Sequence, residues 1–205
     1  MLVSNRMSRK VVTIPPDCPL ADARALLLRH EIRQLPVVRA GSVVGIVTDR
    51  DLRSAKAAAK TVADVMTSKP LVTTPQSSVD EAARILRMRK INALPVTDGP
   101  RLVGILTASD VLDAFVDLSG VAEPTYRFSL VASGIESPAR RIREIVEARR
   151  SELKWLHEEK RGERTQIHLR LKTRRPDDIS DALEAAGFEV CALVAAQPAP
   201  RQRQR

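Results

Sequence analysis

The stretch Gly45–Leu52, with the sequence GIVTDRDL, occurs again in modified form as GILTASDV at Gly104–Val111. In both copies a short apolar run leads into a Thr, and an Asp follows three residues later. A short apolar run is typical of a buried strand, and a Thr followed by an acidic residue at this spacing is typical of a helix start. Each copy therefore predicts a strand that ends at Thr48 or Thr107 and a helix that begins directly after it.

The repeat extends well beyond this motif. A shift of 59 positions aligns the two halves of the N-terminal region without a gap, at apolar, turn and polar positions alike. Agreement of this kind indicates an internal duplication. The aligned pairs include Met7 with Met66, Pro16 with Pro75, Ala23 with Ala82, Leu35–Val37 with Leu94–Val96, and Asp51 with Asp110.

Each copy predicts the order strand, helix, strand, strand, helix. The first strands are expected at Val11–Ile14 and Leu71–Thr73. Residues 19–32 and 78–91 show the apolar spacing of amphipathic helices. Two further strands in each copy precede the Thr, and the last helix follows it.

One copy alone would bury too little apolar surface to be stable, because it is short and the chain has only 2% aromatic residues. We therefore expect an α+β fold in which residues 1–62 and 63–122 form two copies that pack as a pair. Approximate two-fold symmetry in such a pair creates two equivalent grooves, each with its own Thr-x-x-Asp sequence.

These features resemble the cystathionine-β-synthase (CBS) domain pair, or Bateman module. The resemblance covers Val3 to Leu118 and lies in the tandem pattern of Met-Ser or Met-Thr, a strand-ending Pro, a Leu-Pro-Val sequence and Gly-Ile-x-Thr-x-x-Asp. It implies a regulatory module that binds adenosine-containing ligands. In this family the Asp holds the ribose hydroxyls, the Thr contacts ribose or phosphate, and the first strand supplies backbone contacts to adenine.

The Thr-x-x-Asp sequence also has a purely structural explanation. A Thr at the N-cap and an Asp at the third helical position stabilise a helix start by roughly 1 kcal/mol without any ligand. The same helix start can instead receive a phosphate, while the carboxylate accepts hydrogen bonds from a ribose diol. The ligand-binding residues that the resemblance predicts are Thr13, Ile14, Thr48, Arg50, Asp51, Val72, Thr73, Thr107 and Asp110.

The two grooves are not expected to be equal. Thr13 precedes Pro16 in the first copy, whereas Val72 stands at the matching position of the second. Arg50 lies inside the first motif as a candidate phosphate partner, although a solvated arginine is an equal alternative. We therefore expect the first groove to be the better purine site.

The C-terminal third departs from the repeat. Residues 123–197 predict the order β-α-β-β-α-β, which indicates a ferredoxin-like sandwich. This segment resembles an ACT domain, and a CBS pair followed by ACT resembles acetoin-utilisation-type regulatory proteins. The family's Asp-x-Pro-Gly loop is replaced by SGIESP around Gly134, so dimerisation is favoured over ligand binding. Residues 198–205 predict a disordered basic tail.

Charge and composition bound the remaining functions. The net charge of +9 is spread evenly, with an excess of 5 positive charges before Ala122 and 4 after it. Such a balance admits a nucleic-acid partner, but the last domain lacks the aromatic side chains that stack on bases. The two cysteines, Cys18 and Cys191, favour neither a disulfide nor a zinc site.

The sequence shows no catalytic motif, no metal-ligand spacing among its three histidines and no apolar segment of membrane-spanning length. We therefore expect a cytoplasmic, homodimeric regulator that is not an enzyme and requires no cofactor. Its expected ligand is AMP, ADP or ATP, with S-adenosylmethionine and NAD as alternatives. The competing interpretations are a nucleic-acid-binding protein and a structural adaptor whose grooves stay empty; the regulated partner is not identified.

Overall fold

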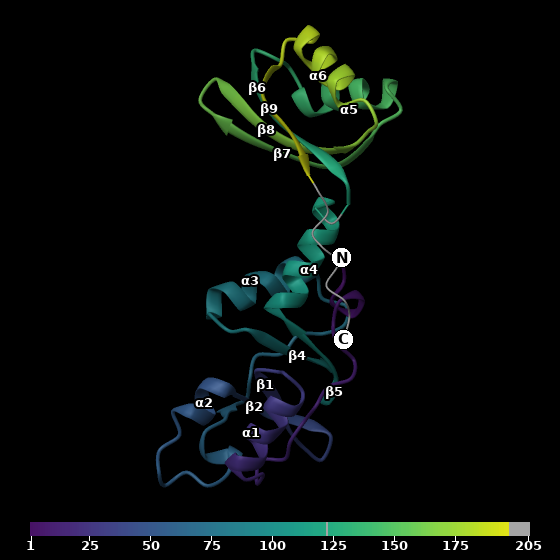
Figure 1. Cartoon of the computed structure of the whole chain (residues 1–205). Coiled ribbons are helices and arrows are strands. Elements are labelled where there is room, and N and C mark those ends of the chain that lie inside the picture. Colours follow the sequence, from purple (N-terminus) through teal and green to yellow (C-terminus); the bar gives the residue numbers. More distant parts are fainter. Residues whose placement is uncertain (122, 197–205) are drawn as a thin grey trace. The chain divides into compact units, whose positions relative to one another are not determined.

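The computed structural model describes residues 1–121 and 123–196 (Figure 1). Within these ranges the chain is a mixed α+β protein with six α-helices and two antiparallel sheets. It divides into two compact units, the first formed by Met1–Leu112 and the second beginning at Asp113. The predicted basic tail, residues 198–205, lies outside the described residues.

The first unit contains the duplicated elements in the predicted order. The first strands shrink to single bridges at Ile14 and Thr73, and the helix after Thr48 is much shorter than the one after Thr107. The elements are α1 (Leu20–Arg29), β1 (Gln34–Arg39), β2 (Ser42–Thr48), α2 (Asp49–Arg53), β3 (Thr67–Ser68), α3 (Val79–Arg89), β4 (Ala93–Asp98), β5 (Arg101–Thr107) and α4 (Ala108–Ser119), the last of which extends into the second unit.

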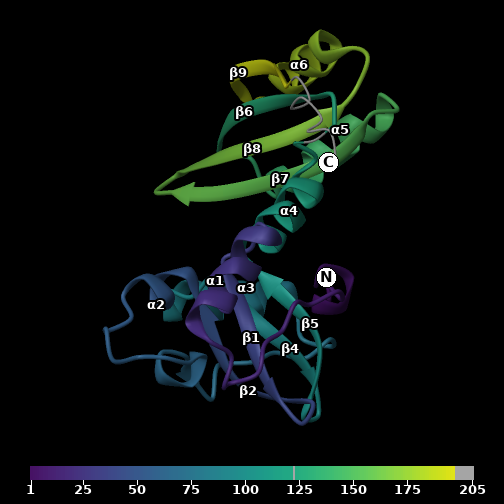
Figure 2. The same ribbon diagram turned by 60° about the horizontal axis from the view of Figure 1, so that its bottom comes forward.

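Strand pairing in the first unit reveals an approximate two-fold axis. The sheet has the order β1-β2-β5-β4, with the short β3 added to β2, and Figure 2 labels the four longer strands. The bridge between β2 and β5 joins Ser42 to Arg101, which are equivalent positions of the two copies. A residue that pairs with its own equivalent lies beside the symmetry axis. The two hairpins are therefore arranged as the pseudo-symmetric pair that the repeat predicts.

The segment that precedes each copy packs against the other copy. Val3 and Met7 are buried in a core with Leu94 and Leu106 of the second copy. Ser8 pairs with Ile105 through two backbone hydrogen bonds of 2.9 and 3.0 Å. The equivalent residues behave in the same way, because Val62 is buried in the core of the first copy and Thr67 pairs with Ile46. Each core therefore contains residues from both copies, with Val3 and Met7 in the core of the second and the partly buried Val65 and Met66 beside Val62 in that of the first.

This exchange explains the glycine of the repeated motif. The side chain of Met7 covers Gly104, and a Cβ atom on Gly104 would lie 2.6 Å from the Met7 sulfur and 3.1 Å from the Ser8 carbonyl oxygen. Met66 and the Thr67 carbonyl cover Gly45 in the same manner. The motif needs glycine here because another backbone approaches the strand closely.

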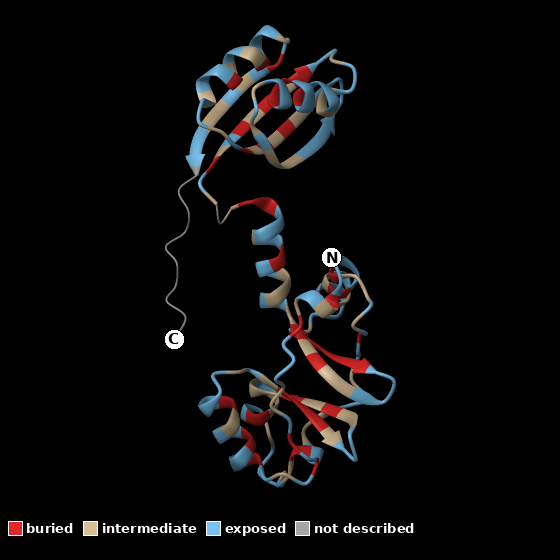
Figure 3. Cartoon of the chain, turned by 90° about the vertical axis from the view of Figure 1, so that its right-hand side faces the viewer, coloured by how far each residue is buried: buried red, intermediate tan, exposed pale blue. Residues whose placement is uncertain are grey.

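The second unit is a four-stranded antiparallel sheet of order β7-β8-β6-β9 with two helices on one face (Figures 1 and 2). Both helices and alternate strand residues supply its core, which includes Phe128, Ile142, Leu169, Ile179 and Leu183. Figure 3 shows this alternation of buried and exposed positions along the strands. The elements are β6 (Thr125–Ser133), α5 (Pro138–Ala148), β7 (Glu152–Arg161), β8 (Arg164–Lys172), α6 (Pro176–Ala185) and β9 (Glu189–Ala196).

Candidate functional site

The first Thr-x-x-Asp sequence forms a capping box at the start of α2. The Thr48 hydroxyl donates to Asp51 Oδ2 over 2.7 Å, and the Thr48 backbone N–H donates to the same oxygen over 2.8 Å. In return the Asp51 N–H donates to Thr48 Oγ1 over 3.2 Å. The structural interpretation of the motif is therefore confirmed for this copy.

The second copy repeats this geometry at the start of α4. The hydroxyl and the N–H of Thr107 both donate to Asp110 Oδ2 over 2.7 Å, and the Asp110 N–H donates to Thr107 Oγ1 over 3.2 Å. In both boxes Oδ2 accepts every bond, and Oδ1 has no hydrogen-bond partner among the described residues. Each carboxylate therefore has one oxygen that caps the helix and one that makes no hydrogen bond within the described residues.

A third box of the same kind occurs outside the repeated motif. Asp64 accepts hydrogen bonds from the Thr61 N–H over 2.8 Å and from the Thr61 hydroxyl over 3.2 Å. Hydrogen bonds from the backbone N–H groups of Thr61 and then Lys60 lower the pKa of the Asp64 carboxyl. This box caps a single turn, Val62–Asp64. The Thr-x-x-Asp spacing alone therefore indicates a helix cap. The boxes at Thr48 and Thr107 differ from this one because each also lies at the end of a sheet strand.

The predicted first-strand residues occupy equivalent places in the two copies. The Ile14 N–H donates to the Pro36 carbonyl over 3.2 Å, and its carbonyl accepts from the Val38 N–H over 2.9 Å. Thr73 makes the matching pair of bonds to β4, and both side chains are buried. The exposed residues just before them, Thr13 and Val72, have backbone N–H groups with no backbone partner in the described part of the chain.

Strand register gives the distance between the two parts of the predicted site. Ile14 lies beside Val37 on one edge of β1, and Gln34 of β1 faces Thr48 across the other edge. With strands about 4.8 Å apart and residues about 3.3 Å apart along them, the Cα atoms of Ile14 and Thr48 are roughly 14 Å apart. The first strand runs parallel to β1, so Thr13 lies nearer to the Thr48 end than Ile14 does.

Arg50 is the candidate phosphate partner that distinguishes the first motif. Its side chain is exposed and makes no ion pair or hydrogen bond within the described residues. The neighbouring charges are already paired, because Arg53 contacts Asp49 over 2.8 Å. The second motif has Ala108 and Ser109 at the matching positions and therefore carries no cation there.

No three His, Cys, Asp or Glu side chains in the described ranges are grouped to hold a metal ion. No helix in those ranges combines the length and the apolar character needed to cross a membrane. Cys18 and Cys191 are both free, and burial followed by the charges of Asp22 and Asp17 raises the pKa of the Cys18 thiol.

Comparison with known proteins agrees with the duplicated architecture. The family model described as "CBS domain" matches this chain twice, at residues 3–58 and 62–117. The inosine-5'-monophosphate dehydrogenase of Mycobacterium leprae is 46% identical over 102 residues, which are 48% of this chain but 19% of the enzyme. The chain therefore spans about a fifth of the length of that relative.

Solved structures of CBS-domain proteins resemble the same region. The CBS pair of MJ0100, solved with 5'-methylthioadenosine and S-adenosyl-L-methionine, is 31% identical with a TM-score of 0.54, covering 56% of this chain and 95% of that one. CBSX2 in complex with AMP is 32% identical with a TM-score of 0.53, covering 56% and 96%. A Vibrio cholerae protein assigned to acetoin utilization (AcuB) is 31% identical with a TM-score of 0.55, covering 60% and 96%.

The family model covers more than half of the chain, and the structure shows the two matched copies as one pseudo-symmetric pair. The chain therefore belongs to the CBS domain family.

Proposed function

We propose that the CBS pair senses an adenosine-containing ligand at its two Thr-x-x-Asp sites. The observation that carries this proposal is the open Oδ1 of Asp51 and Asp110, each held at a helix start by a capping box that uses only Oδ2. A fixed carboxylate oxygen is a good acceptor for a ribose diol, and the helix start beside it favours a phosphate. CBS pairs about 30% identical to this one hold AMP or S-adenosyl-L-methionine, which supports the same ligand class here.

The base would lie near the first-strand residues. The backbone groups of Ile14 and Thr73 are hydrogen-bonded to the sheet. The backbone N–H groups of Thr13 and Val72 are therefore the ones available to donate hydrogen bonds to adenine. The roughly 14 Å between Ile14 and Thr48 suits a ligand that extends from base to phosphate. The first site also has the Thr13 hydroxyl and Arg50, so we assign it the higher affinity for AMP, ADP or ATP; S-adenosylmethionine and NAD remain in the ligand panel.

We assign the second unit as an ACT-like domain that transmits the ligand state. Its β-α-β-β-α-β order and the sheet order β7-β8-β6-β9 support this assignment. Homodimer formation is part of the proposal, because α4 exposes Leu112, Phe115 and Leu118, which are 61%, 55% and 61% exposed. A sensor also requires unequal ligand affinity in two states, since equal affinity shifts no equilibrium. We place this regulator in the cytoplasm and assign it no catalytic step.

A structural adaptor with empty sites is the second candidate, and the Thr61–Asp64 box favours it. That box shows the same capping bonds without a strand end to position a ligand. If capping were the whole purpose of Asp51 and Asp110, all three boxes would respond alike to mutation.

The double variant Asp51→Asn, Asp110→Asn is expected to lose the thermal stabilisation that AMP gives to the unmodified chain. The Asn side-chain oxygen can replace the capping acceptor, while its NH2 group cannot accept a hydrogen bond from the ribose. Hydrogen bonds to charged groups contribute about 1.5–3 kcal/mol, so affinity should fall at least tenfold at each site. Calorimetric titration of AMP, ADP, ATP, S-adenosylmethionine and NAD measures the effect.

Asp64→Asn is the matched control, because it alters a capping box of the same chemistry at the third position. It should leave adenosine-ligand affinity unchanged. Equal affinity of the double variant and the unmodified chain would contradict the site assignment, and absence of binding to every ligand in the panel would support the adaptor.

A further inference from the structure

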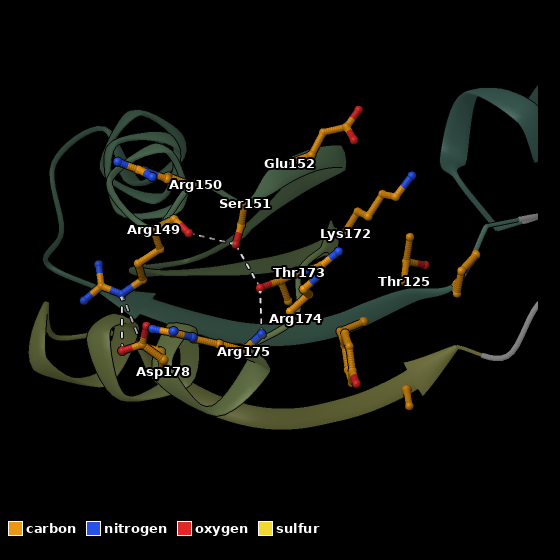
Figure 4. A pocket seen from close by; sticks show the side chains of 13 residues that line it. Thr125, Arg149, Arg150, Ser151, Glu152, Lys172, Thr173, Arg174, Arg175 and Asp178 are labelled. Atoms are coloured by element: carbon orange, nitrogen blue, oxygen red, sulfur yellow. Dashed lines mark hydrogen bonds and ion pairs between the residues drawn. The ribbon is translucent and has the colours of Figure 1, made fainter.

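The second unit contains a large cavity at one end of its sheet. Its volume is about 1030 Å³, and its lining comes from four segments: the start of β6, the turn between α5 and β7, the end of β8 with the loop and first turn of α6, and Ala195 of β9 (Figure 4). Thr125 of β6 lies in the lining, whereas the loop that corresponds to the ACT family's ligand loop follows Ser133 at the other end of β6. About 26 Å of strand separates the two places. The cavity is therefore a different site.

The lining of this cavity is strongly basic. Five cationic side chains and two carboxylates surround it, so three positive charges are in excess. The cationic residues are Arg149, Arg150, Lys172, Arg174 and Arg175, and the acidic ones are Glu152 and Asp178.

Two of the five cations already have partners. Arg149 lies 3.9 Å from the Asp178 carboxylate and donates to the Asp178 carbonyl over 3.2 Å. Lys172 forms an ion pair of 3.2 Å with Glu123. The side chains of the three remaining arginines make no ion pair or hydrogen bond within residues 1–121 and 123–196. These are Arg150, Arg174 and Arg175.

Neutral polar groups complete the lining. The Ser151 and Thr173 hydroxyls lie 2.8 Å apart, Ser151 Oγ also lies 3.5 Å from the Arg149 carbonyl oxygen, and the Arg175 backbone N–H donates to Thr173 Oγ1 over 3.1 Å. Figure 4 shows this chain of bonds on the cavity wall. These bonds hold the turn before β7 and the loop after β8 together beside the arginines.

We propose that this cavity binds a small molecule that carries a diphosphate or polyphosphate group. One phosphate monoester carries about −1.5 to −2 charges near pH 7, so a single phosphate leaves the three-charge excess uncompensated, whereas two linked phosphates balance it. Guanidinium groups bind paired phosphate oxygens in a bidentate manner, and three arginines whose side chains have no partner among the described residues line this cavity. A cavity of about 1030 Å³ has room for a compact polyanion of this kind. This site is independent of the CBS sites proposed above.

Calorimetric titration of the full chain with inorganic pyrophosphate and with tripolyphosphate, in the absence of divalent cations, tests the proposal. Both should bind with one site per chain, and affinity should fall as salt rises. The double variant Arg174→Gln, Arg175→Gln should weaken binding at least tenfold. The control Arg143→Gln, Arg164→Gln removes the same charge from two exposed positions outside the cavity and should leave affinity within about twofold.

Arg150→Gly supplies a variant whose fold is safe. Arg150 has φ +52° at the residue after the helix C-cap, where glycine is favoured, so this change removes the cation without adding strain. It should weaken pyrophosphate binding while the melting temperature stays the same or rises. Unchanged affinity in both this variant and the Arg174–Arg175 double variant would overturn the site.

Further measurements distinguish binding in this cavity from binding at the CBS sites, from general charge attraction and from nucleic-acid binding. Asp51→Asn, Asp110→Asn should retain full pyrophosphate affinity, and loss of it there would assign the anion to the CBS sites and overturn this proposal. Equal weakening by the Arg143–Arg164 control would show general charge attraction and overturn it as well. Binding of a single-stranded RNA oligonucleotide that depends on Arg174 and Arg175, without binding of either inorganic polyphosphate, would assign the surface to nucleic acid instead.

Discussion

Val3→Asp is expected to unfold the part of the first unit that contains β4 and β5, although Val3 lies about 90 residues earlier in the chain. Val3 is fully buried in the core with Leu94 and Leu106. The change removes apolar burial of about 1.5–3 kcal/mol and places an unpaired carboxylate in an apolar core, so the loss of stability should reach about 4 kcal/mol or more. Hydrogen exchange should show loss of protection first in Val79–Thr107.

Asn5→Asp is the matched control for this prediction, because it introduces the same charge at an exposed position of the same segment. It should leave exchange unchanged. The mirror variant Val62→Asp should affect β1 and β2 first, since Val62 is buried in the core of the first copy. Greater loss of protection around β1 than around β4 in Val3→Asp would contradict the exchanged packing.

Gly104→Val is expected to destabilise the first unit by about 2–3 kcal/mol, since overpacking a close contact typically costs 1–3 kcal/mol. The added Cβ would lie 2.6 Å from the Met7 sulfur and 3.1 Å from the Ser8 carbonyl oxygen. The sulfur belongs to a flexible side chain and can move, whereas the backbone oxygen is held by the bridge to Ile105. Chemical denaturation followed by circular dichroism measures the loss.

A double-mutant cycle identifies the contact responsible. Met7→Ala alone removes a buried side chain and should be destabilising, but it also makes room for the valine. The combined variant should therefore lose less stability than the two single variants added together. Additive losses would show that Met7 does not restrict position 104, and Gly45→Val with Met66→Ala repeats the test in the other copy.

The features that could be predicted from the sequence are those that depend on the spacing of nearby residues or on the internal repeat. The 59-residue repeat identified the paired copies, and the Thr48 and Thr107 caps followed from the spacing of Thr and Asp. Helix ends were less accurate, because α1 ends at Arg29 while apolar spacing continues to residue 32. Ser137 is the N-cap residue of α5, but its backbone is left-handed and its side chain makes no capping bond, which residue type alone does not indicate.

The remaining features depend on contacts between distant residues. Nothing in the apolar pattern near Val3 specifies which copy it will enter, because both cores accept an aliphatic side chain at that place. The basic cavity is equally non-local, since its lining joins residues from four separate segments, two of which are ordinary charged turns in the sequence. The open oxygen of Asp51 also escaped prediction, because spacing does not tell which carboxylate oxygen the cap uses.

The exchange of the segments that precede the two copies affects the order in which the chain can fold during synthesis. The first copy lacks part of its interior until Val62 has been synthesised, and Val3 has no place to dock until β4 and β5 exist. The first copy therefore cannot complete its core until part of the second has been synthesised, and neither copy can complete its core alone. Proteolytic cleavage in the exposed stretch around residues 56–58 would accordingly leave two fragments that stay associated, because each core contains residues from both of them.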